Sequence, residues 1–394
     1  MMSEPLSSVR AMTDGRRRRR AKQARRDAQR IKKRTGEEAA ERPRDDPPQE
    51  AVDLGDPLNL IAFASMQVQA SKPDLMAKYR PHKRDPLDFD YLLERFGGDP
   101  TPGMATFVAL FAELLDKGDL QLRYRRAVEE HQQLVPQWVA DLPNTAAYRA
   151  VRVTHVLGDV DQLMIGVRFV GGRDATFVIL IDHLKDSEVK DAFFSGNSID
   201  AGLAVFAKAA DPDCAVVDMS LADARAWIAK GLRSDLVLRD TPTWPDCRPL
   251  LQWLTNRLPE GGEGYRSPGW DWEATGQLCG EFFATEKGAP FDGRVHGDLL
   301  QEIMESGTED PLRWSAARVD QVLDSTAWDA CAPLAVRLDV PDLLRAFIPF
   351  AHSRSGIRDG LTEQALAVVD DMAMGYRREV LRDSDYWDSD DRYA

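Results

Sequence analysis

Four polar residues near the middle of the chain have the side chains best suited to chemistry: Asp182, His183, Lys190 and Asp191. Asp182 and His183 directly follow an apolar run, and mixed folds often place a site where a strand ends before a helix. A histidine beside carboxylates is typical of a general base or a metal ligand. These four residues are therefore the candidate catalytic group.

A structural interpretation competes with this one. The alternation of side chains places His155 and Asp182 on opposite faces of the predicted sheet, and puts His155 and His183 two strands apart, roughly 10 Å between backbones. Two ligands bonded to one metal at about 2 Å would barely span that distance, so we expect no metal site. In this interpretation Asp182 or His183 caps the next helix, and His155 is a hydrogen-bonded core residue.

The elements that must position the candidate residues are strands of alternating apolar pattern. We predict strands over 149–157, 162–170 and 175–182, with glycine-containing turns over 158–161 and 171–174. These turns place His155 opposite Met164, and Met164 opposite Ile181. Because both faces are largely apolar, we expect helices on both faces or a closed sheet.

Helices are predicted on either side of these strands. After them we expect helices over 187–192 and 199–210, a strand over Cys214–Met219, a helix from Ser220 to Lys230 and another over Pro249–Leu258. Further helices are predicted over 58–70, 87–96, 106–117 and 120–134, and over 272–287, 295–306, 315–328, 340–351 and 362–383. The fold class is therefore α+β, mainly helical, with a small antiparallel sheet over about 149–219.

The domain organisation follows from composition and these elements. We expect a disordered basic arm over 1–50, a helical region over 53–142, a sheet-containing core over 143–258, a helical region over 269–383 and an acidic tail over 384–394.

Charge is divided unevenly along the 394 residues, whose net charge is −14. Residues 1–35 contain 13 Lys or Arg and 3 Asp or Glu, a net charge of +10, so the remainder carries −24. A basic arm on an acidic body is typical of contact with a polyanion, because each phosphate contact releases counterions. The residues expected to contact nucleic acid are Arg16, Arg17, Arg18, Arg19, Arg20, Lys22, Arg25, Arg26, Arg30, Lys32, Lys33 and Arg34.

Other roles for the arm remain open at this point. It could be a solubilising tail, the product of a misplaced start codon, a segment that docks on the acidic body, or a contact for anionic lipid. The arm has no aromatic residue, so it offers no base stacking.

Several functional classes lack their motifs in this chain. The four cysteines are about thirty or more residues apart and form no CxxC pair, which favours reduced thiols in a cytoplasmic protein. There is no apolar run of about 18 residues for a membrane span. The sequence contains no GxSxG, P-loop, GxGxxG after a strand or HExxH. We therefore expect no cofactor.

Several segments together resemble a family of uncharacterised actinobacterial proteins. They are Val135–Asp141, Val178–His183, Lys190–Phe193, Pro311–Val322 and Pro341–Ser353. The resemblance covers roughly residues 55–380 and implies a soluble bacterial protein with helices flanking a small sheet. It implies no activity, cofactor or partner. Where the family pattern has Asn-Leu-Gly-Gly after Asp-His, this chain has Leu184-Lys-Asp-Ser, which weakens a catalytic role for that turn.

The sequence favours a non-enzymatic interaction protein whose basic arm contacts nucleic acid or another polyanion. The alternative is an enzyme or small-ligand-binding protein with its site at Asp182 and His183. A protein partner bound through the acidic surface is a further possibility.

Overall fold

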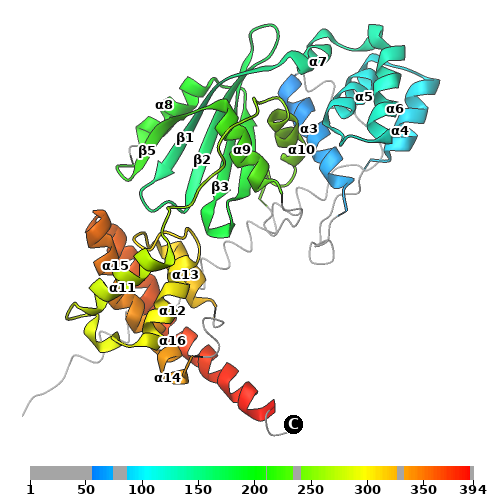
Figure 1. Ribbon diagram of the computed structural model, residues 1–394. Helices are drawn as coiled ribbons and strands as arrows, with labels where there is room; N and C mark the ends of the chain where they lie inside the picture. Colours follow the sequence, from blue (N-terminus) through cyan, green and yellow to red (C-terminus); the bar gives the residue numbers. More distant parts are fainter. Residues whose placement is uncertain (1–55, 74–86, 210, 234–240, 326–331, 391–394) are drawn as a thin grey trace, which may run out of the picture. The chain divides into compact units, whose positions relative to one another are not determined.

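A five-stranded antiparallel sheet organises the fold (Figure 1). The computed structural model describes residues 56–73, 87–209, 211–233, 241–325 and 332–390. The expected basic arm and its nucleic-acid contacts lie outside these residues. Residues Asp56–Ala394 belong to one compact unit. The predicted α+β class, with a small sheet flanked by helices, is confirmed.

The strands run antiparallel in the order β4-β3-β2-β1-β5. They are β1 (Ala146–His155), β2 (Val160–Arg168), β3 (Asp174–Asp182), β4 (Glu188–Ser195) and β5 (Cys214–Met219). The first four form successive hairpins, and the chain then crosses the sheet to add β5 beside β1. The predicted strand Cys214–Met219 is confirmed.

Helices cover both faces of the sheet, as its apolar character on both sides predicts. On one face α8 (Ile199–Ala209) packs with Ile199 against Val151, Met164 and Val178. The other face carries the buried Ile165 and its neighbours. There α9 (Leu221–Gly231) contacts β1 and β4, and α10 (Arg248–Thr255) contacts α9.

The predicted register of the strands is wrong. Met164 lies opposite Val151 on β1 and opposite Val178 on β3, rather than opposite His155 and Ile181. The pairing of β3 with β2 differs from the prediction by three residues. Because this number is odd, the β3 side chains predicted to share a face with Met164 lie on the other face of the sheet. Because both faces are apolar, the alternating pattern does not reveal how many residues each turn takes.

The predicted helix over 187–192 is also wrong, because these residues belong largely to β4. Val189 and Ala192 are buried against the neighbouring strand, where Val189 pairs with Ile181 and Ala192 with Ile179. A short apolar pattern of this kind fits a strand and a helix equally well, and pairing with β3 decides between them.

Three of the described helices before the sheet begin at side-chain caps. The described α-helices of this region are α3 (Pro57–Ala70), α4 (Phe89–Gly98), α5 (Pro102–Leu114), α6 (Asp119–Glu130) and α7 (Gln137–Ala140). Asp56, Asp88 and Thr101 each accept a hydrogen bond from an amide of the first turn of α3, α4 and α5. A carboxylate or hydroxyl at this position satisfies an amide that the helix leaves unpaired. Local sequence thus sets where these three helices start.

The helices after residue 269 share a separate apolar cluster. They are α11 (Trp272–Phe283), α12 (Arg294–Glu305), α13 (Ala316–Leu323), α14 (Leu334–Leu338), α15 (Val340–Ser355) and α16 (Asp359–Asp390). The α16 helix continues through most of the segment that the sequence predicts as an acidic tail. None of the described helices combines the length and apolar content needed to cross a bilayer.

A fully buried arginine lies within this helical region. The Arg318 guanidinium donates to the backbone carbonyls of Asp310, Arg313 and Met304, the last at 2.7 Å. Its Cζ lies 4.2 Å from the centre of the Trp314 ring. Burial lowers the pKa of Arg318 to about 10, so it is still charged at pH 7 and can satisfy these carbonyls.

Candidate functional site

The polar centre of the sheet is Asp161, at the start of β2. It pairs with Thr154 of β1 in the ladder, so the two side chains share a face. The Asp161 carboxylate is 2% exposed. Its Oδ2 lies 3.0 Å from Nε2 of His183 and 3.4 Å from Nη1 of Arg152. Its Oδ1 is buried and has no hydrogen-bond partner.

His183 joins this carboxylate to a serine. It opens the short 3-10 turn η4 (His183–Lys185), and its Nδ1 lies 3.0 Å from the hydroxyl of Ser187. Since an ionised carboxylate only accepts hydrogen bonds, the neutral imidazole donates from Nε2 to Asp161 and accepts at Nδ1 from Ser187. Both ring nitrogens therefore have partners.

The Ser187, His183 and Asp161 side chains follow the order of hydrogen bonds found in hydrolytic triads. A nucleophile must reach its substrate, however, and Ser187 is 3% exposed and does not line the cavity described below. Ser187 follows Asp186 in a turn where both residues have positive φ, 59° and 48°. In this conformation the hydroxyl orients the imidazole and does not meet a substrate.

The positions of Ser187 and β4 depend on a glycine. A Cβ added to Gly231, the last residue of α9, would lie 2.9 Å from the Ser187 carbonyl oxygen and 3.1 Å from the Val189 amide nitrogen. The end of α9 can therefore approach the start of β4 only because residue 231 has no side chain.

Aromatic rings enclose the imidazole. Tyr265, from the segment between α10 and α11, stacks on His183 with ring centres 3.9 Å apart and planes 20° apart. Trp227 of α9 meets both rings edge-on, at 5.7 Å from His183 and 5.1 Å from Tyr265. The Cζ of Arg152 lies 5.4 Å from the Trp227 ring centre. These contacts hold His183 rigidly at the wall of a cavity.

The cavity beside Asp161 has a volume of about 440 Å³, within the usual range for small-molecule sites. We call it the Asp161 cavity. Its wall includes Arg152, Asp161, His183, Tyr265, Arg266 and Arg313. Three guanidinium groups thus face two carboxylates, and the second carboxylate, Asp213, already accepts hydrogen bonds from Arg358. Arg266 and Arg313 in turn lie 3.4 Å and 3.0 Å from carboxylate oxygens of Glu263 and Asp310. The wall therefore alternates between charges of opposite sign, and the Oδ1 atom of Asp161 has no hydrogen-bond partner among the described residues.

The protonation states follow from these contacts. Burial opposes ionisation of Asp161, but hydrogen bonding from His183 and from the Thr154 hydroxyl, followed by the charge of Arg152, holds the pKa of this carboxyl below its usual range. Burial, reinforced by the charge of Asp161, raises the pKa of Tyr265 to about 12. At pH 7 the cavity therefore contains an ionised carboxylate and a neutral phenol.

The structure separates the four residues predicted from the sequence. Asp182 is buried, and its Oδ1 accepts from the Leu184 amide at 3.1 Å, so it caps η4. The Lys190 amine lies 3.9 Å from Oδ2 of Asp182. Neither residue lines the Asp161 cavity, whereas His183 does.

Asp191 has a bracing role. Its Oδ1 accepts hydrogen bonds from the hydroxyls of Thr241, at 2.8 Å, and Thr243, at 2.6 Å. These bonds tie β4 to the segment that precedes α10. Asp191 and His183 therefore do not act on a common group.

His155 also lines the Asp161 cavity. It lies with Asp211 and Cys214 in a group whose ligand atoms are all within 4.8 Å of one another. The Nδ1 atom of His155, however, accepts a hydrogen bond from the Leu157 amide at 3.1 Å, so the neutral ring has its proton on Nε2. Binding a metal would require this pattern to change, and the group does not resemble a preformed metal centre.

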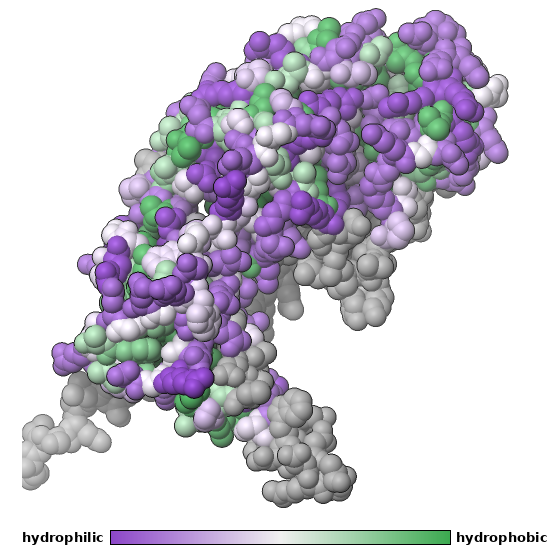
Figure 2. Space-filling view, viewed as in Figure 1, coloured by the Kyte–Doolittle hydropathy of each residue, from purple (hydrophilic) through white to green (hydrophobic). Residues whose placement is uncertain are grey.

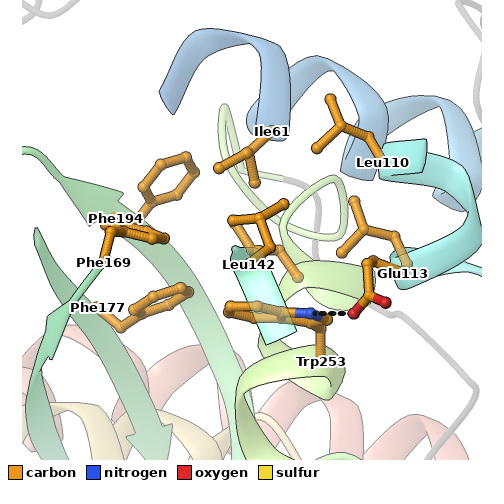
Figure 3. A pocket seen from close by; sticks show the side chains of 10 residues that line it. Ile61, Leu110, Glu113, Leu142, Phe169, Phe177, Phe194 and Trp253 are labelled. Carbon is orange, nitrogen blue, oxygen red and sulfur yellow. Dashed lines mark hydrogen bonds between the residues drawn. The ribbon is translucent and has the colours of Figure 1, made fainter. Parts of the chain in front are cut away.

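A second cavity lies inside the apolar core (Figure 3). Phe177 extends toward the indole of Trp253, and Phe169 and Phe194 lie on the same side of the gap as Phe177. The Nε1 atom of Trp253 lies 3.3 Å from Oε2 of Glu113. Its volume is about 10 Å³, which accommodates no more than about one water molecule. It is a small packing gap and not a ligand site.

Sequence reasoning missed Asp161, Arg152, Ser187 and Tyr265. Asp161 falls in a segment that the sequence predicts as a turn, and its true position depends on the register. Tyr265 lies in a Gly- and Pro-containing connection, Pro259–Pro268, more than eighty residues from His183 in the chain. The local signal that could have indicated an anion on that face is Arg152, an arginine within a strand of largely apolar residues.

No protein-family model matches this chain, and no match was found among curated proteins or among solved structures.

Proposed function

We propose that this protein binds a small polar molecule in the Asp161 cavity, through a hydrogen-bond donor of the ligand to Asp161 and an acidic group to the arginines. The observation that carries the proposal is the buried carboxylate of Asp161, a residue of the cavity wall whose Oδ1 atom has no hydrogen-bond partner among the described residues. A buried acceptor without a partner is costly, and an ammonium, hydroxyl or amide of a ligand would satisfy it.

The surrounding charges support an anionic second group on this ligand. Arg152 extends from β1 toward Asp161, and the exposed Arg266 and Arg313 complete the wall. Planar guanidinium groups bind carboxylate and phosphate in paired hydrogen bonds. Amino acids, sugar phosphates and nucleoside monophosphates combine both kinds of group and are the compounds to test.

Ligand binding is expected to raise the thermal stability of the protein. Thermal unfolding should be followed with millimolar glutamate, glucose 6-phosphate and AMP, and active compounds confirmed by calorimetry. A ligand at about a hundred times its Kd stabilises the folded state by roughly 2.7 kcal/mol. We expect Asp161→Asn and Arg152→Ala to remove the shift.

The matched control is Asp174→Asn, which changes a carboxylate of the β2–β3 hairpin outside the cavity. It should leave the ligand-induced shift intact. The proposal is wrong if all three compounds leave the wild type unchanged, or if a shift persists in the Asp161→Asn variant.

The basic arm supports a second function, contact with nucleic acid or another polyanion. The supporting observation is its composition, 12 Lys or Arg residues against one Asp within Arg16–Arg34. Such a segment attracts phosphates. For duplex DNA, each phosphate contact makes the slope of the logarithm of the binding constant against the logarithm of the salt concentration more negative by about 0.9. The two functions are compatible, because they use different parts of the chain.

Deletion of residues 1–45 is expected to abolish salt-sensitive binding of RNA and DNA while the melting temperature stays unchanged. Fluorescence anisotropy with labelled oligonucleotides at low and high salt measures this. As a matched control, replacing Arg16–Arg20 with glutamine keeps the length of the arm and should weaken binding in part. An intact protein that binds neither RNA nor DNA at low salt contradicts this role.

The cellular location follows as an expectation from the thiols. Cys214, Cys247 and Cys279 are all free, and free thiols are typical of the reducing cytoplasm. We therefore expect both functions to operate there.

A further inference from the structure

One edge of the sheet is open. The β5 strand is the outermost strand beside β1, and it forms the outer edge of the sheet in Figure 1. Val216 and Val217 at its centre are 46% and 40% exposed, and Ala215 and Asp218 are exposed as well. An edge strand presents unpaired amides and carbonyls that can pair with another strand.

The ladder with β1 shows which backbone groups are unpaired. The Val156 amide donates to the Asp213 carbonyl at 2.8 Å, so this is a hydrogen-bonded pair of the antiparallel ladder. Such pairs alternate along the strands, and Ala215 and Val217 therefore also bond toward β1. The amides and carbonyls of the intervening residues, Val216 and Asp218, point outward.

No described residue outside the sheet pairs with these outward groups. Within the described part of the chain, neither Val216 nor Asp218 makes a backbone hydrogen bond outside the sheet. The Cys214 amide is already used, because it donates to the Asp211 carbonyl at 3.2 Å, but the Cys214 carbonyl also points outward. The edge thus offers donors at Val216 and Asp218 and acceptors at Cys214, Val216 and Asp218.

The strand lacks several of the features that discourage pairing. Proteins commonly protect edges with proline, lysine or a bulge, and Cys214–Met219 contains no proline or lysine. Its one charged side chain, Asp218, lies 3.4 Å from Nη2 of Arg149 in the same chain. The pairing of β1 with β5 runs through six residues without a register shift.

The opposite edge of the sheet is different. At the start of β4, Val189 is buried and packs against the end of α9 at Gly231. Farther along, Asp191 is bonded to the segment containing Thr241 and Thr243. The face of the molecule shown in Figure 2 is mostly hydrophilic, with apolar residues in small separate areas.

We propose that β5 is a dimerisation edge, at which two copies of this chain pair antiparallel about a two-fold axis at Val216 and join their sheets into one. In this register each Val216 amide donates to the Val216 carbonyl of the other copy. Each Asp218 amide donates to the Cys214 carbonyl of the other copy. All outward donors of the strand are then satisfied.

The side chains fit the same register. Because the axis is perpendicular to the sheet, opposite residues point to the same face: Val216 meets Val216, and Val217 meets Ala215. No like charges are placed opposite each other, since Asp218 lies across from Cys214. The outward donors and acceptors of β5 are complementary to themselves about Val216, which favours a second copy of the chain as the partner of this edge. The basic arm fits less well, because residues 1–35 contain no matching apolar strand pattern.

The association is tested with the full chain by sedimentation velocity from micromolar to hundreds of micromolar protein. We expect a concentration-dependent dimer. The Val216→Pro variant removes an outward amide and no bond to β1, so the strand should persist while the dimer dissociation constant rises by on the order of tenfold or more. The Val216→Lys variant should have the same effect, and the control Val205→Lys, at an exposed valine of α8, should have none.

Hydrogen exchange gives a second, residue-level measurement. The amides of Val216 and Asp218 should exchange more slowly as protein concentration rises, whereas those of Ala215 and Val217 should be protected at every concentration. A protein that stays monomeric throughout the range overturns the proposal. A dimer that survives both Val216 substitutions also overturns it, since the copies would then associate through another surface.

Discussion

The Arg318→Met variant is expected to lose about 3–5 kcal/mol of unfolding free energy. Methionine approximates the volume of the arginine stem but donates no hydrogen bond. The carbonyls of Met304, Asp310 and Arg313 would then be left without this donor inside the helical region. Buried unpaired acceptors cost about 1–3 kcal/mol each, partly relieved by relaxation. The loss should also remove the contact with the Trp314 ring.

Urea unfolding followed by tryptophan fluorescence measures this loss, because Trp314 is fully buried. The matched control is Arg294→Met in α12, whose side chain is 92% exposed and lies 3.7 Å from Asp298. It should change the midpoint very little, since exposed ion pairs contribute about 0–1 kcal/mol. Equal midpoints for the two variants would show that Arg318 is not needed to satisfy the carbonyls.

The Asp161→Asn variant is expected to be less stable than the wild type by about 1.5–3 kcal/mol at pH 7, the usual magnitude for a hydrogen bond to a charged group. An amide oxygen accepts more weakly from His183 than a carboxylate does. The amide also removes the negative charge that faces Arg152 at 3.4 Å. Its NH₂ group would in addition meet the cavity where the wild type presents a free acceptor.

The same carboxylate makes stability depend on pH. Its pKa is lower in the folded protein than in the unfolded chain, where a free Asp titrates near about 3.9. As pH falls below this value the unfolded chain binds the proton first, so the folded state is progressively destabilised. The contribution of Asp161 is thus fully present above about pH 4 and is lost as pH falls through the lower folded pKa.

Urea midpoints from pH 7 to pH 3 test this dependence. The difference between wild type and Asp161→Asn should be constant at neutral pH and shrink in the acid range. The surface control Asp200→Asn, which breaks an ion pair with Arg149 at 77% exposure of the aspartate, should have little effect at pH 7. A difference that grows as pH falls would mean that Asp161 is not stabilised as the ionised form.

Local chemistry was sufficient to predict most of the helices. The apolar periodicity and the start signals placed α3, α9 and α15 close to their observed positions, because an amphipathic face and a capping side chain act within a few residues. The helix predicted over 106–117 begins at Pro102 instead, after the cap Thr101. The strand Cys214–Met219 was also predicted at its observed bounds. The register of β1, β2 and β3 was not predicted correctly, and β4 was predicted as a helix. Register and strand formation depend on pairing between segments, which the local pattern does not show.

The candidate site, too, was predicted only in part, because most of its residues come from distant segments of the chain. His183 was identified because it stands at the end of an apolar strand, which is visible locally. Asp182 and Asp191 share that neighbourhood, yet one caps η4 and the other braces the segment at Thr241. The residues that do meet His183 come from β2, from the turn before β4 and from the Tyr265 segment.

The sequence by itself determined the α+β class, the approximate positions of most helices, the basic arm on an acidic body and the choice of His183 as a candidate residue. Only the tertiary structure decided that Asp161 is the buried carboxylate beside it, that Ser187 is buried and does not line the cavity, and that β5 is the outermost strand beside β1. The physical reason is the distance along the chain over which each interaction acts. Capping and periodicity act along the chain, whereas burial and hydrogen bonding of a side chain depend on which distant segments pack around it.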